Sequence, residues 1–199
     1  LLRQVLEAVL ARCIAEGLVG GRLFGADASL IKADASRYSK VQAEDWSAGD
    51  TVSRATQEYL DTLDDAAFGG ATSVQPKTLS PSDPAARFTG ANGDRPFFAY
   101  STNYLVDLDH AIIVDVEATA PVRQAEVGSV REMLVRTEEV FGLHPDTLVA
   151  DTAYGSGEML GWLVDEQDID PHIPVFDKTE RNDGAFPATA FTFDREANE

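Results

Sequence analysis

Two long runs of apolar and β-branched residues lie next to each other near the middle of the chain, and they constrain its fold more than any other feature. The runs are FFAYSTNYLVD at 97–107 and HAIIVDVEAT at 110–119. So short a separation is typical of an antiparallel hairpin. A third run of this kind, RLFGADASLIKA at 22–33, predicts another strand. We therefore expect a sheet that begins with three antiparallel strands.

Downstream of the hairpin, helix and strand patterns alternate. Apolar residues recur at helical spacing over 124–140 and again over 157–166. Between these segments lies TLVAD at 147–151, a continuous apolar run of the kind that a parallel sheet prefers, and HIPVF at 172–176 predicts a last strand. This alternation is typical of crossover units with parallel strands. The sequence thus predicts an α/β domain with one mixed sheet flanked by helices.

The rest of the chain is expected to form a helix, an insertion and a tail. Residues 2–16 and 51–67 carry apolar side chains at helical spacing, whereas 69–96 is a long irregular stretch rich in Gly, Pro, Ser and Thr. The expected domains are an N-terminal helix that belongs to an upstream region (1–21), a core (22–177) with a helical and loop insertion after its first strand (about 38–96), and an irregular tail that leads to a further C-terminal part (178–199).

The charge balance and the cysteine content exclude several classes of protein. With 34 acidic and 16 basic residues, the formal net charge is −18, whereas a general electrostatic binder of nucleic acid is expected to be basic. The single cysteine, Cys13, excludes an intramolecular disulfide framework and fits a reducing, cytoplasmic location. Charged residues interrupt every apolar run, so we expect no membrane span and no membrane partner.

Two aspartates occupy positions that favour a binding site. Asp27 lies within the first predicted sheet strand, and Asp151 ends the strand TLVAD just before the turn into a helix. Ligand sites of open α/β sheets lie outside the carboxyl ends of the strands. A partly desolvated carboxylate is unfavourable unless it is paired, hydrogen-bonded or bound to a cation, so a divalent metal ion is a natural partner for both. The structural alternatives are an Asx turn at Asp27 and a plain helix cap at Asp151.

Five segments carry motifs whose order and spacing are informative together. The first contains Asp27-Ala28-Ser29 and Ala33-Asp34-Ala35-Ser36, and the fourth contains Ala150-Asp151-Thr152-Ala153-Tyr154-Gly155-Ser156. The five are GADASLIKADAS (25–36), SDPAARFTG (82–90), FAYSTNYLVDLDHAIIVDVEAT (98–119), LVADTAYGSGEML (148–160) and IPVFDKTERNDGAF (173–186). In this order they resemble the DDE transposases of bacterial insertion sequences, whose catalytic aspartates lie in a D-G-T or D-A-T strand and in an A-D-x-x-Y-x-S motif.

The resemblance implies a fold, an activity and a metal site. The fold would be a ribonuclease H-like core, and the activity would be cleavage and strand transfer at DNA phosphodiesters. Asp27 and Asp151 would be the catalytic residues and the metal ligands, holding Mg²⁺ or Mn²⁺, with two ions in the complete enzyme. The family's third acidic ligand, a glutamate on a later helix, has no match in this chain. The isolated chain is therefore expected to show little or no strand transfer.

The resemblance also implies DNA as a partner, through the ends of an insertion sequence, and a homodimer is possible. Basic residues gather in the first half of the chain, and Lys32, Arg37 and Arg87 among them are expected to meet DNA phosphates. The alternative is scattered surface charge.

Two other functions are compatible with the same residues. The chain could be a non-catalytic remnant that keeps the fold as an association module, or another ribonuclease H-like metal nuclease, because a fold does not determine a function.

Overall fold

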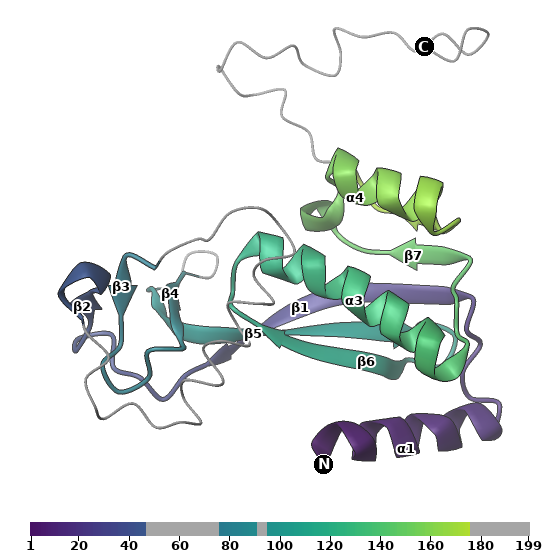
Figure 1. Ribbon diagram of the computed structural model, residues 1–199, viewed down its shortest axis with the longest axis horizontal. Coiled ribbons are helices and arrows are strands. Elements are labelled where there is room, and N and C mark those ends of the chain that lie inside the picture. The colour runs from purple at the N-terminus through teal and green to yellow at the C-terminus, as the bar shows by residue number, and fades with distance from the viewer. Residues whose placement is uncertain (47–75, 91–94, 176–199) are drawn as a thin grey trace, which may run out of the picture.

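The computed structural model describes residues 1–46, 76–90 and 95–175 (Figure 1). The predicted helix at 51–67 and the predicted tail at 178–199 lie outside these residues. The described elements, in chain order, are α1 (Leu2–Ala15), β1 (Leu23–Lys32), β2 (Val41–Gln42), the 3₁₀ turn η1 (Ala43–Asp45), β3 (Thr78–Leu79), β4 (Arg87–Thr89), β5 (Phe97–Asp107), β6 (Ile112–Thr119), α3 (Arg123–Phe141), β7 (Thr147–Val149), the 3₁₀ turn η2 (Thr152–Tyr154), α4 (Gly157–Gly161), the π-helical turn η3 (Trp162–Glu166) and β8 (Asp170–His172).

A six-stranded mixed sheet forms the centre of the fold. β1 pairs with one edge of β5 in antiparallel orientation, and β4 and β6 pair with successive parts of its other edge, also antiparallel. β7 lies parallel to β1, and β8 lies parallel to β7. The main strand order is therefore β6-β5-β1-β7-β8. This confirms the predicted α/β class with a mixed sheet, to which the structure adds a small two-stranded sheet of β2 and β3.

The predicted hairpin is present, but its second strand begins at Ile112 rather than at His110. The buried carboxylate of Asp107 accepts hydrogen bonds from the backbone N–H groups of Asp109 (3.2 Å) and His110 (3.4 Å). Ala111 then adopts a left-handed conformation with φ of 55°. A side chain that binds nearby N–H groups competes with the strand ladder. The turn is therefore longer than the sequence predicts.

Helix α3 packs against the sheet and closes the main core (Figure 1). The helix predicted at 124–140 is confirmed, with one more residue at each end. Its buried Val130 and Met133 belong to the same apolar cluster as Phe24 and Leu105 of the sheet. Each apolar side chain of this size contributes about 1.5–3 kcal/mol when it is removed from water. The core thus fixes α3 over the antiparallel strands.

The segment after β7 differs from the prediction in two details. Residues 157–166 are helical as predicted, but α4 gives way to the π-helical turn η3 after its first turn. The last strand, predicted at 172–176, covers Asp170–His172 instead. The N–H of Asp170 donates to the carbonyl of Asp146 (2.9 Å), which brings the strand beside β7 earlier. Pro174 has no N–H to continue the ladder.

The stretch predicted to be irregular, 69–96, contains two short strands in its described part. β3 pairs with β2, and β4 pairs with β5 through Phe88 opposite Phe98. The rings of these two phenylalanines lie 5.1 Å apart, a favourable distance for aromatic packing. The prediction was wrong here because so short a strand depends on its partner strand and leaves no periodic pattern.

Ion pairs of Arg3 link the first helix to strand β6 of the sheet. The helix predicted at 2–16 is confirmed as α1. Arg3 donates to the carboxylate of Asp115 on β6 (2.8 Å), which also accepts from Arg136 of α3 (2.8 Å). None of the described helices has the length and apolar character that a membrane crossing requires.

Candidate active site

Asp27 and Asp151 lie at the same edge of the sheet, where β1 and β7 part. The parallel pairing of these strands ends with Gly25 opposite Val149. Each aspartate comes two residues after the last paired residue of its strand. We call this point, beyond Gly25 and Val149, the β1–β7 fork. The two carboxylates therefore occupy equivalent places at the carboxyl ends of neighbouring parallel strands, where α/β sheets bind ligands.

Asp27 projects from the face of the sheet opposite the main core. Ala26 is buried on the side of the main core, and successive side chains of a strand point to opposite faces, so Asp27 projects to the other side. Among the described residues, β1 has no strand partner on its β7 edge beyond Gly25.

Each aspartate is held by one local hydrogen bond. Asp27 Oδ1 accepts from the N–H of Ala28 (2.8 Å), and Asp151 Oδ1 accepts from the N–H of Ala153 (2.7 Å), which caps η2. Both residues are exposed. No hydrogen bond from another described residue reaches Oδ2 of either carboxylate. Asp151 thus forms the cap expected as its structural alternative, whereas Asp27 lies inside the continuous strand β1 and bonds only to the next residue, which is not an Asx turn.

These two oxygens suit a hard divalent cation. Mg²⁺ and Mn²⁺ prefer carboxylate and water oxygens, and Mg²⁺ is commonly held by one or two carboxylates and keeps several waters. Within residues 1–46, 76–90 and 95–175, no group of three His, Cys, Asp or Glu side chains is close enough together to hold a metal ion. The chemistry of the two carboxylates is that of ligands for a hard divalent cation.

Two further residues lie near the aspartates. Tyr154 follows Asp151 on η2 and is only 3% exposed, and its hydroxyl has no hydrogen-bond partner in the described structure. Burial raises the pKa of Tyr154, and the negative charges of Glu126, Asp151 and Asp27 raise it further. The hydroxyl therefore stays protonated. Glu126 approaches from the first turn of α3.

The start of α3 is fixed against this turn. Arg123 donates to the carbonyls of Ala153 (2.8 Å) and Thr152 (2.9 Å) in η2. Glu126 Oε1 accepts from the hydroxyl of Ser101 (2.8 Å), a fully buried residue of β5. These contacts hold the first turn of α3 next to the loop that carries Asp151.

Glu126 and Tyr154 are not predicted as site residues from the sequence. Tyr154 stands in the A-D-x-x-Y-x-S motif, so that motif contained a usable signal. For Glu126 the sequence offers only a weak indication of a role, namely that it lies in the first turn of a helix that follows a hairpin. The contact of Glu126 with Ser101 depends on how α3 packs, which no local pattern encodes.

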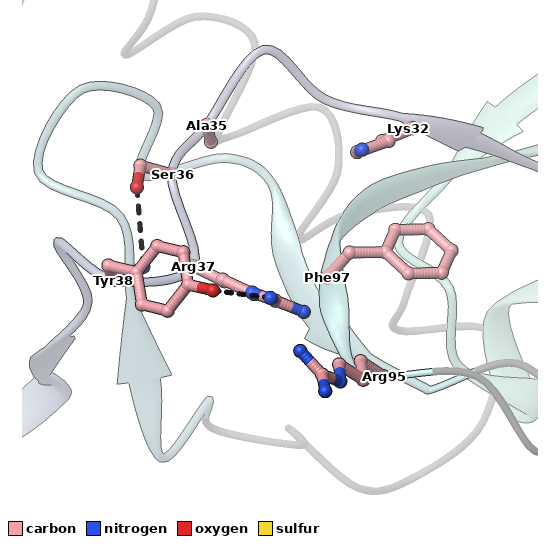
Figure 2. A pocket seen from close by; sticks show the side chains of 7 residues that line it. All are labelled: Lys32, Ala35, Ser36, Arg37, Tyr38, Arg95 and Phe97. Carbon is pink, nitrogen blue, oxygen red and sulfur yellow. Dashed lines mark hydrogen bonds between the residues drawn. The ribbon is translucent and has the colours of Figure 1, made fainter.

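A basic pocket of about 780 Å³ lies at the far end of β1 (Figure 2). Lys32 ends β1, Arg37 follows in the next loop, and Arg95 precedes β5. Figure 2 shows these three cations around the same space, together with the rings of Tyr38 and Phe97. Lys32 is five residues beyond Asp27 on the same strand, which corresponds to about 17 Å. Two of the three residues predicted to meet DNA, Lys32 and Arg37, thus share one pocket.

The cations of this region differ in their contacts. The Arg37 guanidinium lies over the Tyr38 ring, 4.7 Å from its centre, and donates to the Tyr38 hydroxyl. Tyr38 itself is 81% exposed. Arg87, the third predicted residue, lies on β4 and donates to the carbonyls of Pro84 (3.0 Å) and Ala85 (3.3 Å). It is not among the residues that line the pocket.

Comparison with known proteins gives one finding. No curated protein and no solved structure is significantly similar to this chain. A model of the family described as transposase DDE domain matches residues 58–196. Asp151 lies within the matched range, and Asp27 lies before it. The match spans more than half of the sequence, and the chain belongs to the transposase DDE domain family.

Proposed function

We propose that this chain forms the catalytic core of a DNA transposase, in which Asp27 and Asp151 hold a divalent metal ion for phosphodiester cleavage and strand transfer at insertion-sequence ends. One observation carries the proposal. The register of β1 and β7 leaves both aspartates equally far past the last paired residues, at one edge of the sheet. Family membership supports phosphoryl transfer on DNA as the reaction class.

The strand order supports a ribonuclease H-like fold. Three antiparallel strands are followed by two parallel strands on the other side of β1, in the order β6-β5-β1-β7-β8. We propose that this core covers 22–177, with an insertion at about 38–96 between the first two long strands of the sheet. The described part of that insertion holds β2, β3 and β4.

Phosphoryl transfer requires mainly positioning and charge neutralisation. A bound Mg²⁺ or Mn²⁺ would supply Lewis acidity at the reacting phosphate. The protein's own contribution is to hold the two carboxylates in fixed orientations. Asp27 and Asp151 each accept a backbone N–H through one oxygen, which restrains the rotation of the carboxylate and presents the other oxygen to the ligand.

The basic pocket is proposed as the place where the chain meets the DNA backbone. With a net charge of −18, attraction between the whole chain and DNA is unfavourable, so contacts have to come from a local group of cations. Lys32, Arg37 and Arg95 provide such a group. The distance of about 17 Å from Asp27 corresponds to about five nucleotides of one strand, which are spaced about 3.4 Å apart.

Thermal melting with and without Mg²⁺ or Mn²⁺ tests the metal site. We expect millimolar Mn²⁺ to raise the melting temperature of the wild-type chain by several °C, because a ligand that binds only the folded state stabilises it. Asp27→Asn and Asp151→Asn should abolish this rise. Asp45→Asn, which changes an exposed aspartate of η1, is the matched control and should keep it.

Two results would decide against the proposal. A wild-type melting temperature that neither ion changes would contradict the metal site and favour a non-catalytic association module. An equal rise in the wild type and in both fork variants would show that the ion binds elsewhere.

A further inference from the structure

The cations of the basic pocket have no acidic partners in the part of the chain that the structure describes. Lys32, Arg37 and Arg95 form no ion pair there. Five other arginines of the described structure each pair with a carboxylate at 2.5–3.3 Å, namely Arg3, Arg12, Arg22, Arg131 and Arg136. In a chain with a net charge of −18, three unpaired cations around one space are available for an anionic ligand.

An exposed aromatic ring stands beside these cations (Figure 2). Tyr38 is 81% exposed, so its ring contributes little to the packing of the fold. Its backbone is nevertheless held in a turn, because the N–H of Tyr38 donates to the hydroxyl of Ser36 (3.3 Å) and the N–H of Ser39 donates to the Ser36 carbonyl (3.2 Å). The ring is therefore presented to the solvent from a fixed place at the pocket.

The sheet brings the walls of the pocket together. Lys32 is the last residue of β1 that pairs with β5, and the N–H of Ala33 then donates to the carbonyl of Phe98 (2.9 Å). Ala33 and Phe98 also belong to a second apolar cluster. The loop that carries Arg37 is thus anchored next to the start of β5, which Arg95 precedes. Such a site needs little rearrangement when a ligand binds.

We propose that the basic pocket holds an unpaired nucleotide of a DNA strand, with its phosphates on Lys32 and Arg95 and its base against the ring of Tyr38. This deepens the proposed function and rests on it, because it takes DNA as the ligand of the pocket. Bases inside a duplex stack on one another, whereas an unpaired base offers a free face to a side chain. An aromatic ring beside a group of cations is the arrangement by which proteins hold single strands.

The size of the pocket and the contacts of Arg37 fit this ligand. A volume of about 780 Å³ lies within the range of about 300–1,000 Å³ for pockets that hold small molecules, so there is room for a base as well as a phosphate. The Arg37 guanidinium lies over the Tyr38 ring and donates to its hydroxyl, which makes Arg37 a positioning residue for the ring. Because every base has a face that can stack, we expect little sequence preference.

Fluorescence anisotropy with two labelled ligands tests the role of the ring. The ligands are an oligothymidylate of about ten nucleotides and a duplex of about the same length, each titrated with the whole chain in the absence of divalent ions. We expect Tyr38→Ala to weaken binding of the single strand about 10-fold and binding of the duplex less than about twofold, because only the unpaired base loses a stacking partner.

Matched variants separate stacking from other effects. Tyr38→Phe keeps the ring and loses only the hydroxyl, so it should bind both ligands as the wild type does. Lys32→Ala and Arg95→Ala remove phosphate contacts and should weaken binding of both ligands. Arg22→Ala, which changes an exposed arginine outside the pocket, should leave both affinities unchanged. Because Tyr38 is exposed, Tyr38→Ala should melt at the wild-type temperature.

Competition with thymidine 5′-monophosphate distinguishes a DNA strand from a free nucleotide. The oligothymidylate brings several phosphates, so the free nucleotide should displace it only at concentrations at least about 10-fold higher than those of unlabelled oligothymidylate. Displacement at equal concentrations would assign the pocket to a free nucleotide and overturn the proposal.

The remaining outcomes distinguish this inference from the proposed function. A loss confined to the single strand in Tyr38→Ala supports the unpaired nucleotide. Equal losses for both ligands, or no loss for either, overturn it, while the proposed contact with the DNA backbone stands if Lys32→Ala still weakens duplex binding. Wild-type binding of both ligands in Lys32→Ala and Arg95→Ala overturns the pocket as a DNA site, and the melting experiment with Mn²⁺ decides separately on the aspartates.

Discussion

Asp115 shows how one buried side chain holds three elements together. Its carboxylate is 4% exposed on β6 and binds Arg3 of α1 and Arg136 of α3, each at 2.8 Å. Burial alone would lower the pKa of Arg136, but hydrogen bonds and charges from Asp115 and Glu117 raise it overall. The guanidinium therefore stays charged, and the pairing compensates the desolvation of both partners.

Replacing this carboxylate should be strongly destabilising. We expect Asp115→Asn to lower the free energy of unfolding by about 3 kcal/mol, because it leaves two guanidinium groups with only the Glu117 carboxylate as partner. Glu158→Gln is the control, since the Glu158 carboxylate is exposed and its pair with Arg131 should contribute less than about 1 kcal/mol. Urea denaturation followed by circular dichroism measures both values. Equal losses in the two variants would show that Asp115 has no special role.

At the scale of single residues, the sequence predicts part of the candidate site. Asp27 and Asp151 stand in recognisable motifs and at strand positions where ligands bind, so both can be selected as candidates without a structure. Glu126 and Tyr154 cannot be selected in this way. What sets them apart is tertiary: Tyr154 is buried, with no partner for its hydroxyl among the described residues and with charges of other elements acting on it, and Glu126 accepts from Ser101 of β5.

At the scale of elements, hydrophobic periodicity predicts where helices and long strands lie, and local hydrogen bonds decide where they end. The extent of α3 is predicted almost completely because both its apolar spacing and its terminal glycine are visible. The start of β6 is missed because the Asp107 carboxylate extends the turn, and β8 is misplaced because its register is set by β7. Strand ends thus depend on partners that are distant in sequence.

The end of α3 offers a prediction at this scale. Gly142 has φ of 65°, and its N–H donates to the Glu138 carbonyl (2.8 Å). Gly142→Ala should lower the free energy of unfolding by about 1 kcal/mol, because a side chain disfavours the left-handed conformation. The control is Gly157→Ala, where φ is not positive and a new Cβ meets nothing within 4 Å, so stability should change little. Thermal melting of both variants tests this, and unchanged stability in Gly142→Ala would contradict it.

At the scale of the whole molecule, connection lengths predict the hairpin and the parallel crossovers, and hence a mixed sheet. They do not predict the register between β1 and β7, which places Asp27 and Asp151 equally far past the last paired residues of the two strands. Nor do they predict that β4 extends the sheet beside β6 or that Lys32, Arg37 and Arg95 line one pocket. These features arise from contacts between segments far apart in the chain.

The acidic charge of the molecule makes DNA binding a sensitive test of the basic pocket. We expect Lys32→Ala combined with Arg37→Ala to weaken binding to duplex DNA about 10-fold or more at low salt. The slope of log K against log salt should fall in magnitude by about 2, because two phosphate contacts are lost. Arg22→Ala, an exposed arginine paired with Asp146 at the other end of β1, is the control. Fluorescence anisotropy over a range of salt concentrations measures both quantities, and equal effects of the pocket and control changes would contradict the assignment.

The most direct test of the central claim is a double-mutant cycle on Mn²⁺ affinity with Asp27→Asn, Asp151→Asn and the double variant. If both carboxylates bind the same ion, each single change should remove most of the affinity, and the double change should remove little more. Additive losses, or a single variant that binds as the wild type does, would contradict a shared cation at the β1–β7 fork.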